Sequence, residues 1–254
     1  MKKGIASLVC IIIGLIIIIV SFFGPWYSTH MRYSYESYGG YGGFGSNYSS
    51  NTEYYQNFYL TKIEMQGTMM GQDMSQSFSY DYMKEQMESS SQSTNSGLYN
   101  IFGNTMYIVI GVLITSIIAL IGIAGFTLNI GNYNTMRKIG LIFGIITFIL
   151  AILSIGYFWM AWNNQMQESI SNYSSYGGSY DTPEFTYGFW FNQSQAGNQM
   201  SMGPGFAWYI MIIGGFLSLI STILIIKKPK QNISDIKSNL ETQSYISDTN
   251  QDNQ

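Results

Sequence analysis

The chain has 254 residues, of which 46% are hydrophobic and only 10% are charged, and its formal net charge is −3. A balance so close to neutral gives no reason to expect a nucleic-acid partner. Cys10 is the only cysteine and His30 the only histidine, which excludes an intrachain disulfide, a cysteine-based zinc site and any metal site with several histidines.

Four apolar stretches contain no Asp, Glu, Lys, Arg or His; they are residues 4–24, 105–126, 139–162 and 206–226. Roughly 20 apolar residues, at a rise of about 1.5 Å each, cross a hydrocarbon core of about 30 Å. Because the backbone in lipid must satisfy its own hydrogen bonds, each stretch is expected to be a helix. The sequence therefore predicts an all-α membrane protein, a bundle of four transmembrane helices whose first segment is 1–24.

The basic residues give the expected direction of these spans. Eight of the eleven flank the spans on one side: Lys2, Lys3, Arg137, Lys138, Lys227, Lys228, Lys230 and Lys237. Cytoplasmic loops carry such an excess of Lys and Arg. We therefore expect a multi-pass protein of the cell membrane with both termini, the turn 127–138 and a disordered tail 227–254 in the cytoplasm. The long segment 25–104 and the shorter segment 163–205 then lie outside.

Aromatic residues stand at the outer ends of the spans. An indole or phenol has an apolar body and one polar group, so it favours the boundary between hydrocarbon and water. The expected interfacial anchors are Trp26, Tyr27, Trp159, Trp162 and Trp208. Pro25 helps to end the first helix because it has no amide hydrogen to donate.

Small residues recur at helical spacing within each span. In a membrane such residues let two helix backbones approach closely, where hydrophobicity gives no driving force. The residues expected to pack one helix against another are Gly14, Gly111, Gly140, Gly144, Gly214 and Ser218. The same helix faces would also serve self-association, and the sequence leaves both readings open.

The outer segments contain a Tyr/Gly/Ser-rich tract at 33–50 and several stretches in which large and polar residues alternate. Alternation at 57–65, 78–82 and 185–191 predicts strands, with turn-like glycines at 67–73, and 26–33 extends the first span as a further strand. We expect a small extracellular β-sheet stabilised by cross-strand aromatic pairs. The alternative is disordered loops with chance alternation. Segments 84–97 and 163–182 are expected to be polar and helical or irregular.

Pro25 and Trp26 follow the first span directly, and strands are expected in both outer segments. In these respects the sequence resembles the claudin-like tetraspan membrane proteins, in which Pro-x-Trp leads into the first extracellular strand. The resemblance implies four spans and an outer sheet. The disulfide-bonded cysteine pair of that group has no counterpart here, and the sequence 97–99, Gly-Leu-Tyr, lies too late to match its Gly-Leu-Trp. The chain is also similar to uncharacterised prokaryotic four-span proteins, which implies no activity.

Signs of catalysis and transport are missing from the sequence. No Asp, Glu, Lys, Arg or His lies in the spans to mark a proton or ion pathway, and no nucleotide-binding, nucleophile-elbow or zincin motif occurs. Asp81, Glu85 and Glu88 lack the spacing of a calcium loop and are interpreted as a solvated acidic face. His30 has the chemistry of a pH sensor, but a plain interfacial residue is the simpler interpretation. We expect no enzyme, no cofactor and no bound metal.

Sixteen of the twenty-one tyrosines lie in the outer segments, where they offer amphipathic contact area at low entropic cost. The sequence therefore favours a non-enzymatic cell-surface interaction or structural protein, in contact with the lipid bilayer and a protein partner or a second copy. The alternatives are an accessory subunit of a larger membrane complex and a channel or transporter component. Candidate partner contacts are Tyr33, Tyr35, Tyr38, Tyr41, Phe189, Trp190 and Phe191, and candidate glycosylation sites are Asn47, Asn172 and Asn192.

Overall fold

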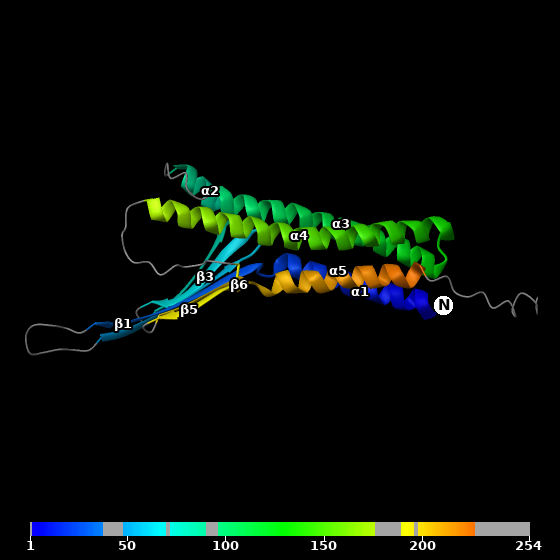
Figure 1. Ribbon diagram of the computed structural model, residues 1–254. Coiled ribbons are helices and arrows are strands. Elements are labelled where there is room, and N and C mark those ends of the chain that lie inside the picture. Colours follow the sequence, from blue (N-terminus) through cyan, green and yellow to red (C-terminus); the bar gives the residue numbers. More distant parts are fainter. Residues whose placement is uncertain are drawn as a thin grey trace, which may run out of the picture.

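A computed structural model describes residues 2–37, 48–69, 72–89, 96–175, 189–195 and 198–226. Four helices form an elongated bundle (Figure 1): α1 (Lys2–Phe23), α3 (Ser96–Leu128), α4 (Tyr133–Ser175) and α5 (Phe206–Ile226). The main contacts join α3 to α4 and α1 to α5. The two pairs are connected because α4 also contacts α5 and α1 also contacts α3. All four helices are long and apolar enough to cross a membrane, which fits a multi-pass membrane protein.

Two of these helices extend well past their apolar stretches. The helix α3 begins at Ser96, nine residues before the stretch 105–126, and α4 continues to Ser175, thirteen residues past 139–162. The polar continuation of α4 contains Gln, Met and Glu, which favour helix, and no proline to stop it. Hydropathy marks the part of a helix that lipid can surround, whereas the helix itself continues until a residue or contact ends it.

The turn between α3 and α4 is only four residues long, 129–132. Asn129 and Gly131 adopt left-handed backbone conformations, with φ of 56° and 76°, which reverse the chain after α3. The side-chain oxygen of Asn132 then accepts hydrogen bonds from the backbone amides of Asn134 (3.1 Å) and Thr135 (3.3 Å) and so caps α4. This tight turn makes α3 and α4 antiparallel neighbours.

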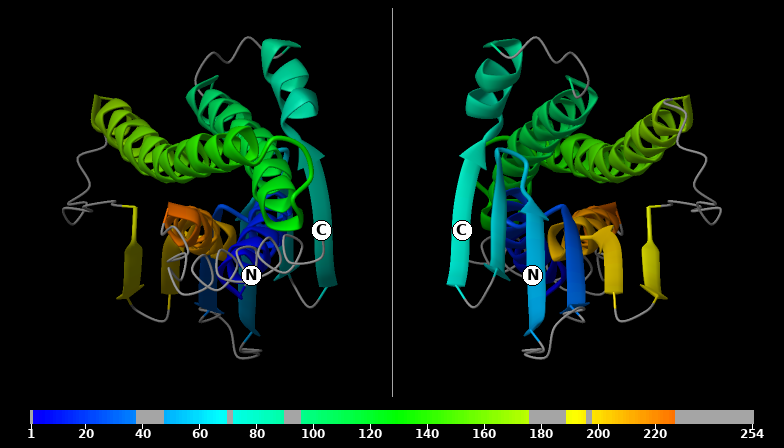
Figure 2. Two further views of the ribbon diagram at one scale, coloured as in Figure 1. Left: turned by 90° about the vertical axis from the view of Figure 1, so that its right-hand side faces the viewer. Right: turned by 90° about the vertical axis from the view of Figure 1, so that its left-hand side faces the viewer.

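A six-stranded antiparallel sheet in the order β4-β3-β2-β1-β6-β5 extends from the ends of α1 and α5 that lie away from the α3–α4 turn, and α3 and α4 continue alongside its base (Figures 1 and 2). Its strands are β1 (Tyr27–Ser37), β2 (Tyr48–Phe58), β3 (Lys62–Met69), β4 (Gln72–Ser79), β5 (Phe191–Gln195) and β6 (Asn198–Pro204). The neighbouring strands β1 and β6 come from the two different segments 25–104 and 163–205; β1 follows α1 along the chain, and β6 precedes α5. The expected sheet built from both segments is therefore present.

The strands predicted from the sequence are confirmed only in part. The strand expected at 26–33 is β1. The single strand expected at 57–65 was wrong, because a hairpin turn at residues 59–61 divides it between β2 and β3. The strand expected at 78–82 was also wrong: Ser79 ends β4, and its hydroxyl accepts a hydrogen bond from the Tyr82 amide at 3.2 Å, capping helix α2 (Tyr80–Ser89). Of the strand expected at 185–191, residues 185–188 lie outside the described part, 189–190 form a bend and Phe191 begins β5.

Pairing in register gives the sheet two unlike faces. Residues directly opposite each other on neighbouring strands point to the same side. The side that includes Tyr27, Phe58 and Ile63 is buried at its base against α3 and α4 and is called the inner face here. Every charged residue in the six strands lies on the opposite, outer face: Arg32, Glu36, Glu53, Lys62, Glu64 and Asp73. The sheet is thus amphipathic.

Candidate interaction surface

The base of the sheet is joined to the bundle by backbone hydrogen bonds around Trp26. The Trp26 amide donates to the Phe58 carbonyl at 2.7 Å, and the Gly205 amide donates to the Trp26 carbonyl at 2.9 Å. The Ala207 amide, in the first turn of α5, donates to the Pro25 carbonyl at 3.1 Å. These bonds hold the ends of α1, β1, β2 and α5 together, so the sheet cannot turn freely on the bundle.

A buried aromatic cluster reinforces this junction. Tyr27 and Phe58 of the sheet pack against Phe102 of α3 and Phe158 and Trp162 of α4, and all five are at most 6% exposed. Across the contacts between sheet and bundle, ring centroids lie between 3.9 Å (Tyr27 and Trp162) and 5.8 Å (Phe58 and Phe102) apart. Aromatic rings bury large areas and add specific edge and face contacts. The cluster therefore fixes the base of the sheet to α3 and α4.

Three of the five expected interfacial anchors belong to this junction and are enclosed by protein. Trp26 and Tyr27 have no exposed surface, and Trp162 is 1% exposed. Burial raises the pKa of the Tyr27 phenol to about 12, and its hydroxyl donates to the Phe189 carbonyl at 3.2 Å. Trp159 is 45% exposed and Trp208 is half-buried, so an interfacial position remains a prediction for these two.

The candidate partner contacts also include both exposed and buried residues. Tyr33 and Trp190 are 43% and 55% exposed, and Phe191 is half-buried. Phe189 is only 2% exposed and packs on Tyr27 and Phe158, so its assignment as a partner contact was wrong. The alternation of Phe189 with its neighbours indicated that it lies on one face of an extended segment. It did not indicate whether that face is exposed or buried by the rest of the protein. Tyr35 lies in β1, whereas Tyr38 and Tyr41 lie outside the described residues.

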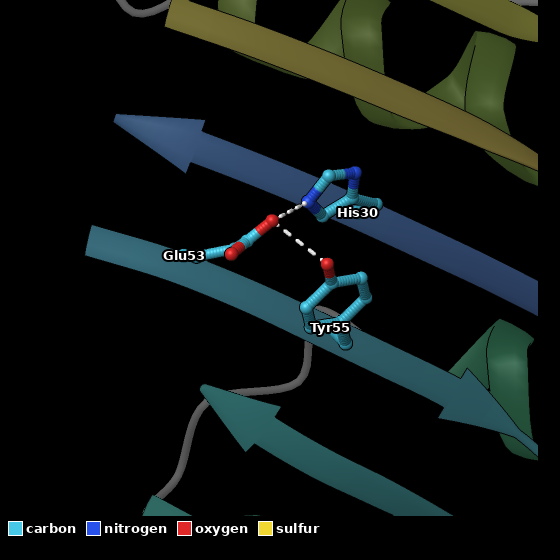
Figure 3. A network of polar contacts seen from close by, with 3 residues as sticks. All are labelled: His30, Glu53 and Tyr55. Carbon is cyan, nitrogen blue, oxygen red and sulfur yellow. Dashed lines mark hydrogen bonds and ion pairs between the residues drawn. The ribbon is translucent and has the colours of Figure 1, made fainter. Parts of the chain in front are cut away.

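A polar network on the outer face joins β1 to β2 (Figure 3). Nε2 of His30 and the Tyr55 hydroxyl both lie within hydrogen-bond distance of the same Glu53 carboxylate oxygen, at 2.9 and 2.7 Å. The rings of His30 and Tyr55 stack with centroids 4.3 Å apart. The hydrogen bonds from Tyr55 and then His30 hold the Glu53 pKa below its ordinary range, and the same Glu53 contact raises the pKa of Tyr55.

This network places His30 on the sheet, in contact with a carboxylate. Sequence reasoning missed Glu53 and Tyr55, because only the pairing of His30 with Tyr55 and of Arg32 with Glu53 brings them together. The signal that existed was local: Glu53 and Tyr55 are two residues apart and therefore on one side of a strand.

Methionines gather on the inner face above the aromatic cluster. Met31, Met65, Met74, Met200 and Met202 all point to this side by their register. Met74 is 45% exposed and the others are half-buried. Of these methionines, only Met65 lies in a stretch that was expected to be a strand. Met200 and Met202 are two residues apart, a spacing that also predicts side chains on one face of a strand. Methionine is apolar, flexible and a weak acceptor through its sulfur.

The residues expected at helix contacts lie where two helices meet. A Cβ atom added at Gly14 or Gly214 would lie 3.3 Å from the backbone oxygen of the other, across α1 and α5. One added at Gly140 would lie 2.9 Å from a side-chain carbon of Ile123, and the Ser218 hydroxyl donates to the Gly144 carbonyl at 3.3 Å. Gly111 faces Leu150 at an ordinary contact distance of 3.6 Å. These approaches run between α1 and α5, α3 and α4, and α4 and α5.

Within the described residues, no group of three His, Cys, Asp or Glu side chains is placed to hold a metal ion. Asp81 and Glu85 are exposed on α2. Of the candidate glycosylation sites, Asn192 is exposed in β5, Asn172 lies in α4 and Asn47 lies outside the described residues.

A scan against protein-family models finds no match, and no curated protein sequence matches this chain. The function must therefore be argued from the sheet and its junction with the bundle.

Proposed function

We propose that this is a non-enzymatic interaction protein of the cell surface, which holds its sheet outside the membrane and contacts a protein partner through the sheet. The observation that carries the proposal is the rigid mounting of exposed aromatic residues. Tyr33 lies on β1 and Trp190 directly precedes β5, so exposed aromatic residues from two distant segments stand at one sheet whose base a buried aromatic cluster fixes to the bundle. Exposed aromatics on a rigid base make good contacts because little freedom is lost on binding.

The proposed orientation is supported by the position of the basic turn. Arg137 and Lys138 stand in the first turns of α4, at the end of the bundle opposite the sheet (Figure 1). An Arg137 amino group there donates to the Ile226 carbonyl at the end of α5, at 2.9 Å. With the excess of positive charge on the cytoplasmic side, the sheet lies outside.

Orientation is tested by labelling single cysteines on intact cells, in a Cys10→Ala background. Ser75→Cys places a thiol on the exposed strand β4, and Tyr133→Cys places one at the exposed start of α4. A membrane-impermeant maleimide is expected to label Ser75→Cys on intact cells and Tyr133→Cys only after the cells are opened. Labelling in the reverse order would contradict the proposed orientation.

The contact surface is tested by photo-crosslinking in native membranes. A photoreactive residue replaces Tyr33 on β1 or Trp190 directly before β5, at the sheet, or Ile13 or Ile220 on the bundle, where both isoleucines are 45% exposed. We expect one stoichiometric adduct from the sheet positions and only lipid adducts from the bundle positions. A protein adduct from Ile13 or Ile220 alone would replace the proposal with an accessory subunit that binds through its helices.

A further inference from the structure

We propose that Met31, Met200 and Met202 form a binding site for a soft monovalent metal ion, Cu(I), on the inner face of the sheet. This goes beyond the proposed interaction function and does not depend on it. The site unites residues far apart in the sequence, because β1 belongs to the first outer segment and β6 to the second.

The pairing of β1 with β6 brings the three side chains together. Met31 is directly opposite Met200, and Met202 follows two residues along β6 on the same side. Directly opposite residues have Cβ atoms about 5 Å apart and diagonal neighbours about 7–8 Å, and residues two apart on a strand are separated by about 7 Å. Each thioether sulfur lies two bonds beyond its Cβ atom, so all three sulfurs can converge on one point.

The Met31 sulfur is accessible, and Met202 packs at the edge of the buried cluster. All three methionines are half-buried. The Tyr33 hydroxyl donates a hydrogen bond to the Met31 sulfur at 3.3 Å, which places that sulfur where a polar group reaches it. A thioether has two lone pairs, so this hydrogen bond leaves one for a metal. A methionine used only to fill a core gap would be enclosed by apolar atoms.

The surroundings select the kind of metal. Thioether sulfur is a soft, neutral ligand that favours Cu(I), whereas Zn(II), Ca(II) and Mg(II) favour imidazole, thiolate or oxygen ligands. Within the six strands, no charged residue lies on the inner face. His30 and Glu53 are on the outer face, on the far side of the sheet from these sulfurs. A neutral set of three thioethers suits a cation of single charge.

Two other methionines of the same face provide matched controls. Met31 is the nearest member of the site to both: Met65 of β3 is two strands away and two residues along, and Met74 of β4 is three strands away in the same row. At about 4.8 Å per strand and about 7 Å per two residues, these separations are about 12 and 14 Å, too far for their sulfurs to join the site. Leucine replaces each methionine with little change of volume and removes only the sulfur.

The experiment uses the full chain in detergent micelles with Cys10→Ala, because a thiolate would also bind Cu(I). Cu(I), kept reduced by ascorbate, is titrated against a chromophoric Cu(I) chelator. We expect one saturable equivalent per chain, with Met31→Leu, Met200→Leu and Met202→Leu each weakening binding by at least about tenfold, the loss typical even of outer-sphere changes. Met65→Leu and Met74→Leu should leave the affinity unchanged, and X-ray absorption should show sulfur ligands only.

Several outcomes would overturn the site. They are the absence of saturable Cu(I) binding, an equal loss in all five leucine variants, and nitrogen or oxygen ligands in the absorption spectrum. Far-UV circular dichroism of each variant separates loss of a ligand from loss of the fold. Success or failure of the Cu(I) titration does not affect the crosslinking test of the proposed interaction function, since Tyr33 and Trp190 are not among the proposed ligands.

Discussion

Ser7 of α1 and Ser221 of α5 exchange hydrogen bonds across the bundle. Each hydroxyl donates to the other residue's backbone carbonyl, at 2.8 Å from Ser7 and 2.7 Å from Ser221, and the two hydroxyl oxygens are 2.9 Å apart. Both side chains are fully buried. Small residues let helices approach, and hydroxyl groups form hydrogen bonds between them. This pair therefore joins α1, which leads into β1, to α5, which follows β6.

Ser7→Ala and Ser221→Ala are each expected to lower the free energy of unfolding by about 0.6 kcal/mol and at most about 1.7 kcal/mol, the range of interhelical hydrogen bonds in membrane proteins. The double variant should lose less than the sum, because both changes remove the one contact between the two hydroxyl oxygens. Unfolding in bicelles measures all three. Ser154→Ala is the control: its hydroxyl is also buried but bonds only to Ala151 of its own helix. Strictly additive losses of stability would contradict an interaction between the two hydroxyl groups.

Alanine at two glycines of α4 is expected to have opposite effects. A Cβ atom at Gly140 would lie 2.9 Å from Cγ1 and 3.1 Å from the amide nitrogen of Ile123, whereas nothing lies within 4 Å of one at Gly156. Gly140→Ala should cost about 1–3 kcal/mol of stability by overpacking. Gly156→Ala should stabilise by up to about 1 kcal/mol through helix propensity. Thermal unfolding in detergent gives both signs, and equal effects would rule out the close approach.

Phe102→Ala is expected to loosen the sheet from the bundle. Phe102 has no exposed surface and contacts rings of the sheet, α2 and α4, including those of Phe58, Tyr80 and Trp162. Removing a buried phenylalanine costs about 3–5 kcal/mol. Hydrogen exchange should accelerate at the base of β1 and β2 more than in the middle of α5. Tyr33→Ala, at an exposed position of the same sheet, should leave exchange at the base unchanged.

The Glu53 carboxyl is expected to titrate below its ordinary value of 4.5, chiefly because it accepts a hydrogen bond from Tyr55. A carboxyl with a lowered pKa in the folded state contributes stability above its unfolded pKa, and this contribution is lost as the pH falls through the folded value. Tyr55→Phe should raise the Glu53 pKa towards 4.5 and reduce the loss of stability in acid. Carbon-13 NMR of the glutamates follows the titration; Tyr33→Phe, which leaves this network intact, should not shift it.

At the candidate surface, the sequence predicted residue types and extended segments but not which side chains are buried. Alternation indicated that Phe189, Trp190 and Phe191 belong to an extended segment, but burial separated them: Phe189 fills the aromatic cluster and Trp190 is exposed. The expected anchors Trp26 and Trp162 have the amphipathic chemistry of an interface, yet both are enclosed because the sheet covers that end of the bundle. A residue type limits where a side chain is stable; its neighbours decide which of those places it occupies.

The four apolar helices followed from the sequence alone, because a helix satisfies its backbone hydrogen bonds within one stretch of chain and lipid selects that stretch by its length and hydropathy. The start of β1 after Pro25 was equally local. The sheet's register was not, since Tyr27 pairs with Phe58 on one side and Pro204 on the other. Only the tertiary structure therefore assembled the network of His30, Glu53 and Tyr55 and the methionines of β1 and β6. Pairing between distant segments depends on how whole faces fit together, and no short stretch of sequence contains that information.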